Sequence, residues 1–327
     1  MKKRILSFLL AVASAATLMA GPALGVGERV GEKTEESSGV ELADELVALA
    51  AGPALPDLLL PEASGKKTAQ NAKAVIDYSN ISDGYVMVKF TAQSDRRLKA
   101  KVTGPSGDYQ QYDLTQGEWE VLPLSDGSGS YKVSVLQKKN DDPKNTKYAT
   151  ALSVTFSAEL TDEFAPYIRP NQYVDYGGAE KTLAKAAELV GEETDALKKV
   201  EAIYDFVVNN LTYDKEKAAT VQSGYLPVLD QVLEAKTGIC FDYAALMAGM
   251  LRSQGVPCKL VVGYAGTAYH AWISVWSEKD GWVEGIIYFD GKVWKRMDPT
   301  FASSLNNSEA ILNYIGDGKN YTEKYLY

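Results

Sequence analysis

The sequence has 327 residues, of which 46% are hydrophobic, and a formal net charge of −9 at pH 7. This length suits two folded domains, by the rule of roughly 150 residues per domain. An acidic surface disfavours nucleic acid and anionic lipid as partners. Because the chain contains one histidine and two separated cysteines, these residues form no cluster of metal ligands, and we expect no metal or other cofactor.

Residues 1–25 have the composition of a secretory signal peptide. Three basic residues follow Met1, an apolar run extends from Ile5 to Ala20, and small residues lead to Gly25. This order is typical of a signal peptide, and the apolar run is shorter than the ~20 residues of a membrane span. Removing the three basic residues changes the net charge from −9 to −12. We therefore expect a secreted, extracellular or surface-associated protein without stable membrane insertion.

The next two segments are predicted to be a linker and a β-sandwich. Residues 26–70 are acidic and rich in small residues, which indicates a flexible linker. Residues 71–162 contain short alternating runs such as YVMVKF and YKVSVLQ, separated by turns such as DGSGS. This pattern predicts an all-β sandwich of immunoglobulin-like type. No residue in it marks a site, so we expect it to pack against its neighbour, with binding of a surface or substrate as the alternative.

Residues 163–327 change from helical to strand periodicity. TDALKKVEAIYDFVVNNLTY places Leu197, Val200, Ile203, Val207 and Leu211 on one helical face. The strand-like runs LVVGY, HAWISVW, VEGIIYF and KVWKRMD follow later in the chain. Helices followed by an antiparallel sheet predict an α+β domain.

The two cysteines are predicted to be free thiols. Cys240 opens an apolar stretch that is helical to about Gln254, which spans roughly 20 Å at 1.5 Å per residue. The four residues from Gln254 to Cys258 recover at most about 13 Å. The remaining gap exceeds the ~7 Å limit between the Cα atoms of a disulfide.

Cys240 and His270 are the candidate catalytic residues. Cys240 begins the buried helix, where the helix dipole and free N–H groups stabilise a thiolate and a developing oxyanion. A cysteine nucleophile needs a base, and His270 is the only histidine. Asp298, which ends a predicted strand before Pro299, is the candidate that orients the imidazole. The alternatives are a small buried hydrophobe for the cysteine, a hydrogen-bonded strand histidine, and a turn cap for the aspartate.

Three blocks of residues 190–305, GICFDYAALMAGMLRSQGVPCKLVVGY, HAWISVW and KVWKRMDPTF, resemble the transglutaminase-like superfamily. The resemblance implies a papain-like core with Cys240 as nucleophile, His270 as general base and Asp298 as the residue that orients the histidine. His270 and Asp298 are 28 residues apart, so residues 277–285 are expected to loop out or bulge. The family pattern also includes a side-chain oxyanion donor. Gln231 is the nearest upstream amide, but its spacing gives no support for that role.

The sequence thus predicts an acyl-transfer enzyme that acts on peptide or glutamine amides through a cysteine thioester. Its substrate would be a protein, a peptide or a cell-wall peptide. Hydrolysis is slightly favoured over protein cross-linking, because bacterial members of the family are often peptidase-like. The alternative is a catalytically inactive papain-like module that binds at the cell surface.

Overall fold

Strand β4 shows how the N-terminal part of the fold buries alternate side chains. In strand β4 (Leu98–Thr103), Leu98, Ala100 and Val102 are buried while Lys99 and Lys101 are partly exposed. The computed structural model describes residues 57–140, 142, 146–279, 281–283, 287–289, 294–296 and 321–327. The predicted signal peptide and residues 26–56 of the predicted linker lie outside these ranges.

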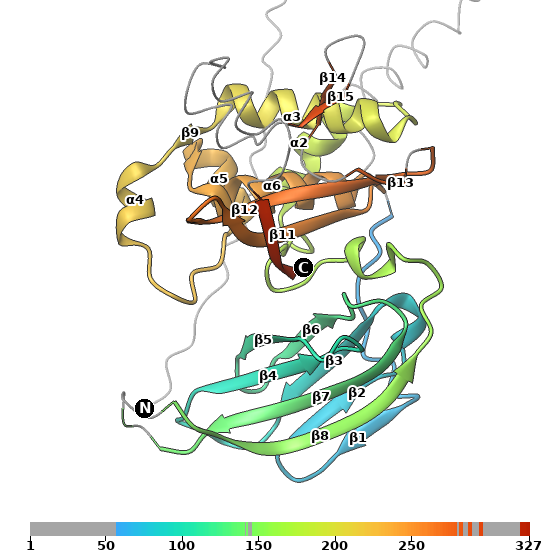
Figure 1. The fold of residues 1–327 in the computed structure, drawn as a ribbon, viewed down its shortest axis with the longest axis vertical. Helices are drawn as coiled ribbons and strands as arrows, with labels where there is room; N and C mark the ends of the chain where they lie inside the picture. The colour runs from blue at the N-terminus through green and yellow to red at the C-terminus, as the bar shows by residue number, and fades with distance from the viewer. Residues whose placement is uncertain are drawn as a thin grey trace, which may run out of the picture. The chain divides into compact units, whose positions relative to one another are not determined.

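Two four-stranded antiparallel sheets form the β-sandwich (Figure 1). One sheet has the order β1-β2-β3-β6 and the other has the order β5-β4-β7-β8. The remaining strands are β1 (Thr68–Gln70), β2 (Ala74–Asp77), β3 (Tyr85–Phe90), β5 (Tyr109–Leu114), β6 (Trp119–Pro123), β7 (Gly129–Lys138) and β8 (Tyr148–Ala158).

The sandwich begins slightly before the predicted boundary at residue 71. Strand β1 pairs with β2 across a turn that Asn71 closes. The Asn71 side-chain oxygen accepts hydrogen bonds from the backbone N–H groups of Lys73 at 2.8 Å and Ala74 at 3.1 Å. The predicted boundary is late because β1 has only three residues. Alternation over three residues is too short to distinguish a strand from a flexible linker.

One tyrosine fastens β7 to the turn before it. The hydroxyl group of Tyr131, at the start of β7, donates to the Gly127 carbonyl at 2.7 Å and accepts from the Asp126 N–H at 3.0 Å. The immunoglobulin-like type of the sandwich stays a prediction.

The C-terminal part of the fold begins with a layer of helices, as predicted. The predicted apolar face of α3 is buried, from Leu197 to Leu211. Asp195 caps this helix by accepting from the Leu197 N–H at 2.9 Å and the Lys198 N–H at 3.1 Å. The helices are α2 (Glu180–Val190), α3 (Ala196–Asn210), α4 (Lys215–Thr220), α5 (Leu229–Ala235) and α6 (Cys240–Ser253).

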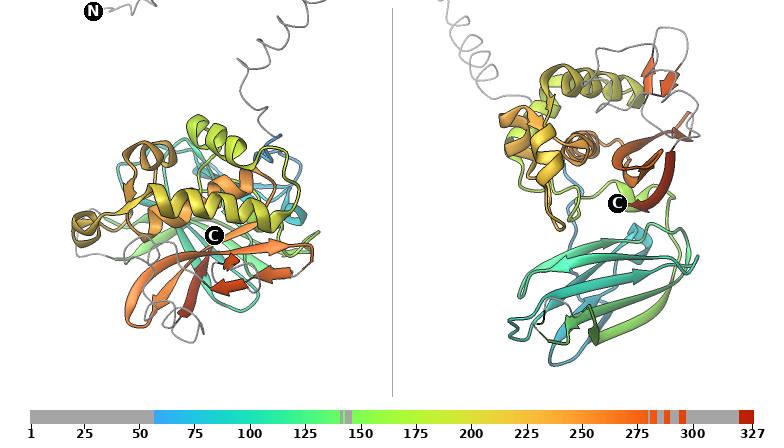
Figure 2. Two further views of the ribbon diagram at one scale, coloured as in Figure 1. Left: turned by 90° about the horizontal axis from the view of Figure 1, so that it is seen from above. Right: turned by 60° about the vertical axis from the view of Figure 1, so that its left-hand side comes forward.

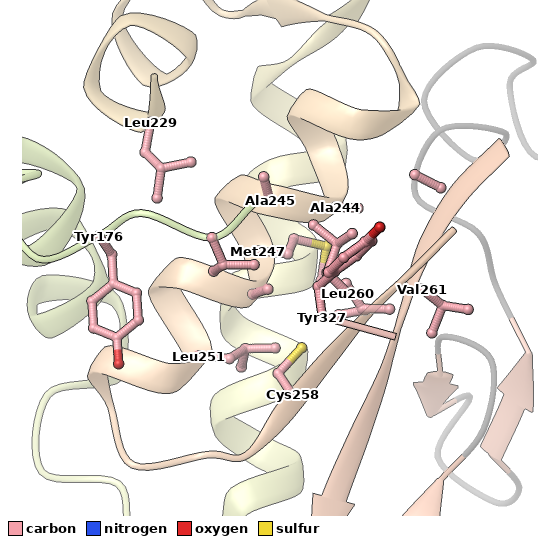
Figure 3. Packing of buried hydrophobic residues seen from close by; sticks show 14 of the residues in the cluster. Tyr176, Leu229, Ala244, Ala245, Met247, Leu251, Cys258, Leu260, Val261 and Tyr327 are labelled. Atoms are coloured by element: carbon pink, nitrogen blue, oxygen red, sulfur yellow. The ribbon is translucent and has the colours of Figure 1, made fainter. Parts of the chain in front are cut away.

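Helix α6 is the centre of this domain. Every residue from Asp242 to Ser253 is buried, which confirms the prediction of a helix that is apolar on all sides. It lies between the other helices and the antiparallel sheet (Figure 2). Figure 3 shows Met247 and Leu251 of α6, with Leu229 of α5 and Cys258 of the sheet nearby. Because α6 is packed on every side, its N-terminus has a fixed position.

The sheet beside α6 has the order β13-β12-β11-β16, and all its pairs are antiparallel. Its strands are β11 (Cys258–Ala265), β12 (Ala268–Ser277), β13 (Gly281–Val283) and β16 (Tyr321–Leu326). Separately, β14 (Ile287–Phe289) pairs in antiparallel fashion with β15 (Trp294–Arg296). The short strands β9 (Thr212–Tyr213) and β10 (Thr237–Gly238) pair in parallel.

The expected loop after the His270 strand takes a different form. Ser277 pairs with Gly281, and Val275 pairs with Val283, so the described part of residues 277–285 folds back as a hairpin. Gly281 has φ +70, a conformation that glycine adopts without strain, and it opens the returning strand. Among the described residues, no helix has both the length and the apolar character needed to cross a membrane.

Candidate functional site

Cys240 and His270 line the same cavity, which has a volume of about 690 Å³. Cys240 enters it from the start of α6, and His270 enters it from β12. Asp298 lies outside the described residues. Gln231 is on α5, is exposed to solvent and is not among the lining residues. The structure therefore brings two of the three predicted catalytic residues together.

The backbone before Cys240 is held on both sides. Strand β10 pairs Gly238 with Tyr213 of β9. A Cβ atom added to Gly238 would lie 2.6 Å from the Cβ of Asp242, so this position admits only glycine without a shift. Ile239 is extended, with φ −96 and ψ 176, and Cys240 begins the helix. The first backbone N–H groups of a helix have no acceptor within that helix. The Cys240 thiol therefore lies next to the N–H groups of the first turn of α6.

Asp242 anchors this helix start through a buried polar network. Its side chain is fully buried and accepts hydrogen bonds from the Ile239 N–H at 2.7 Å and from Lys217 Nζ at 2.7 Å. The hydroxyl group of Tyr225 donates a further short hydrogen bond to its other oxygen. Lys217 and Tyr225 belong to α4 and the loop that follows it. The sequence alone did not point to this network, although Asp242 is the only charged residue between Phe241 and Leu251.

The partners of Asp242 are matched to its charge. Burial alone would lower the pKa of Lys217, but hydrogen bonds to Asp242 and Tyr225 raise it above its ordinary value. Burial, followed by the hydrogen bond to Asp242, raises the pKa of Tyr225. Lys217 therefore remains a cation and Tyr225 a neutral donor, and both fit a buried carboxylate.

His270 is almost completely buried among aromatic side chains. Its ring centroid lies 6.1 Å from that of Trp272 and 6.4 Å from that of Tyr321. It is opposite Gly263 of β11, where an added Cβ would lie 2.0 Å from the Thr322 carbonyl oxygen. The close approach of three strands at this point fixes the position of the imidazole at the cavity wall.

The two cysteines are free, as predicted, and their environments differ. Cys240 is half-buried at the cavity. Cys258 is fully buried near Leu251 of α6 (Figure 3), and burial raises the pKa of its thiol to about 12. Cys258 is therefore a packing residue, and Cys240 as the nucleophile stays a prediction.

The β-sandwich supplies one wall of this cavity. Tyr109, Gln111 and Asp113 of β5 line it together with Cys240 and His270. The sandwich therefore borders the cavity as well as packing against its neighbour. The sequence carried no signal for this wall, because exposed polar residues at alternate positions of a strand are common on any sheet.

The other lining residues are Gln172, Tyr173, Tyr213, Ala218, Val221–Leu226, Ile239, Phe241, Val262, Tyr269, Ala271, Tyr325 and Tyr327.

Contacts next to the cavity join the sandwich to the helical domain. The described residues fall within one compact unit, Ala51–Tyr327. The Gln172 side-chain amide donates to the Asp113 carbonyl and to Glu120 Oε2, both at 2.7 Å. The ring of Tyr112, on β5, lies edge-on to the rings of Tyr173 and Tyr327, with centroids 5.8 and 5.9 Å away.

Glu120 makes stability depend on pH. Burial raises its pKa from 4.5 to about 7, against the opposing hydrogen bond from Gln172. Between these values the unfolded chain releases a proton that the folded chain keeps, so the free energy of unfolding falls as pH rises, by at most about 3 kcal/mol. We expect Glu120→Gln to remove this decrease, as measured by urea denaturation at about pH 5 and about pH 8. If the free energy of unfolding of the variant differs between the two pH values as much as that of the unsubstituted protein, Glu120 is not the group responsible.

The cavity is thus lined by a cysteine at the start of a buried helix and by a histidine on the adjacent antiparallel sheet of an α+β domain. Residues 183–285 match the Transglutaminase-like superfamily. This part of the chain is therefore a transglutaminase-like core, as its sequence blocks predicted.

The matches to individual proteins are partial. The chain is 28% identical over 124 residues to the uncharacterized protein YebA of Bacillus subtilis, covering 32% of this chain and 17% of YebA. It is 31% identical over 68 residues to a protein-glutamine gamma-glutamyltransferase of Pseudomonas aeruginosa, covering 16% of this chain and 10% of that protein. A solved structure of a candidate cysteine protease from Cytophaga hutchinsonii aligns over 74% of this chain and 76% of that chain, with 14% identity and a TM-score of 0.37. The chain thus spans less than a fifth of the length of the first two relatives.

Proposed function

We propose that this protein is a cysteine-dependent acyl-transfer enzyme that acts on an amide of a peptide or of a glutamine side chain. The observation that carries this proposal is the shared cavity of Cys240 and His270, with the cysteine at a helix N-terminus. Cys258 is buried away from the cavity, so Cys240 is the one thiol of the chain that a substrate reaches.

The proposed reaction has two steps. His270 accepts the thiol proton, and the Cys240 sulfur attacks the carbonyl carbon while backbone N–H groups of α6 stabilise the oxyanion. The C–N bond then breaks, and His270 gives its proton to the departing amine. The resulting thioester is resolved by water, which gives hydrolysis, or by a second amine, which gives transfer. Asp298 is proposed to orient His270.

We propose hydrolysis as the principal outcome and transfer to an amine as the second. The peptidase-like character of bacterial family members supports hydrolysis, and the name of the relative in P. aeruginosa supports transfer. We also propose a secreted location, on the strength of the composition of residues 1–25 alone.

Alkylation of the two thiols tests the proposal. The mature chain is treated with iodoacetamide between about pH 5 and about pH 9, and the labelled peptides are quantified by mass spectrometry. We expect Cys240 to react rapidly near neutral pH, because it borders the cavity beside His270. Cys258 serves as an internal control and should remain unlabelled while the protein is folded. Equal, slow labelling of both thiols would instead favour the inactive binding module.

A further inference from the structure

The outer face of sheet β5-β4-β7-β8 carries a group of lysines. The inward side chains of β4 are buried in the sandwich, so Lys99 and Lys101 lie on the opposite face. Lys132 of β7 is exposed and lies next to the buried Tyr131 and Val133. We call Lys99, Lys101 and Lys132 the lysine face.

The strand register places these lysines close to one another. Lys132 is opposite Thr103 of β4, and Lys101 is two residues before Thr103 on the same side of that strand. Lys99 precedes Lys101 by two residues in turn. Since adjacent strands are about 4.8 Å apart, the lysine face forms a short diagonal row across two neighbouring strands.

This row is positive within an acidic chain. The carboxylate of Asp113 lies 4.0 Å from Lys99 and is already bound by Arg97 through two hydrogen bonds of 2.8 Å. The ion pairs found among the described residues include none to Lys101 or Lys132. Lys101 Nζ instead lies 3.9 Å from the centroid of the Tyr109 ring. The lysine face therefore retains a net positive charge in a chain of net charge −9.

The lysine face is continuous with the cavity of Cys240. Lys99 is paired with Asp113 and Lys101 with Gln111 across the β4–β5 register. Asp113 and Gln111 themselves line the cavity with Cys240 and His270. A polypeptide that leaves the cavity across β5 meets the lysines on the next strand.

We propose that the lysine face binds an acidic segment of the polypeptide substrate, adjacent in sequence to the amide that reacts at Cys240. This inference rests on the proposed function for the identity of its partner. Charge complementarity selects the segment, because the net negative charge of the chain repels carboxylates while the lysine face beside the cavity attracts them. The sandwich is thereby a determinant of substrate choice.

Binding to the Cys240→Ala variant of the full chain tests this proposal without turnover. The probe is a fluorescein-labelled peptide of alternating glutamate and serine, and its binding is measured by fluorescence anisotropy beside a lysine–serine peptide of equal length. We expect the acidic peptide to bind more tightly. The triple substitution K99A/K101A/K132A should weaken its binding about tenfold, and a rise in salt from about 25 mM to about 300 mM should weaken it further.

A matched control removes the same charge from the other sheet. Lys66, Lys67 and Lys73 are exposed around β1 and β2, and K66A/K67A/K73A should leave binding of the acidic peptide unchanged. Thermal unfolding of both triple variants verifies that they fold.

Three results would overturn the proposal. The first is equal affinity for the two peptides, and the second is an equal loss of affinity for the acidic peptide in the two triple variants. The third is tighter binding of an anionic polysaccharide than of the acidic peptide. A failure of the proposed function would give a different result. The unsubstituted chain would then show no amide turnover, while the acidic peptide would still bind more tightly than the lysine–serine peptide.

Discussion

Cys240→Ala is expected to lower kcat/KM for amide hydrolysis or transfer by at least about a thousandfold, because no thioester forms without the thiol. The fold should persist, since Cys240 is half-buried at the cavity edge and its backbone is held by Gly238 and Asp242. Release of ammonia or of a new amino terminus from peptide substrates measures the activity. Circular dichroism and thermal unfolding measure the fold.

Cys258→Ala provides the matched control for this substitution. It removes the other thiol, which is fully buried and is not among the residues that line the cavity. Turnover should be unchanged, and the lost packing should lower stability by about 1 kcal/mol or somewhat more. Activity that survives in Cys240→Ala, or disappears in Cys258→Ala, would exclude the proposed nucleophile.

Asp242→Ala is expected to lower the free energy of unfolding by about 3–5 kcal/mol. This is the usual cost of removing one partner of a buried ion pair and leaving the other charge without its counter-ion. The substitution leaves Lys217 Nζ, the Tyr225 hydroxyl and the Ile239 N–H without their shared acceptor. Asp242→Asn keeps an oxygen for the Ile239 N–H but loses the charge, so its effect should be smaller. Urea denaturation at neutral pH measures both.

A double-mutant cycle separates the ion pair from the helix cap. Lys217→Met removes the cation from the same network, and we expect the substitutions Asp242→Asn and Lys217→Met to be less than additive, with a coupling energy of about 1–3 kcal/mol. Additive effects would mean that the two side chains do not stabilise each other. Both single variants should also reduce turnover, since the network fixes the start of α6 and the loop beside the cavity.

The fold was predictable where one periodicity persisted over many residues. The helix from Cys240 to Ser253 and the buried face of α3 follow from apolar spacing alone. The short strand β1 escaped prediction because three residues establish no period. The hairpin of Gly281–Val283 with β12 escaped it because turn geometry, and not hydrophobicity, sets that register.

The candidate site was predictable where chemistry restricts the residue type. A single histidine and a cysteine at a helix start left few choices, and the structure places both at one cavity. Lys217 and Tyr225 could not be assigned to Asp242 from sequence, because they come from another helix and its loop and have ordinary local surroundings. Asp298 stays a prediction, since it lies outside the described residues.

The separation of the two thiols has a consequence for oxidation. A thiolate converted to sulfenic acid is protected from further oxidation when a second thiol condenses with it to a disulfide. Cys258 is the only other cysteine of the chain, and it is fully buried and is not among the residues that line the cavity. Oxidised Cys240 therefore has no internal resolving partner, and its recovery depends on small thiols or reductases supplied from outside the molecule.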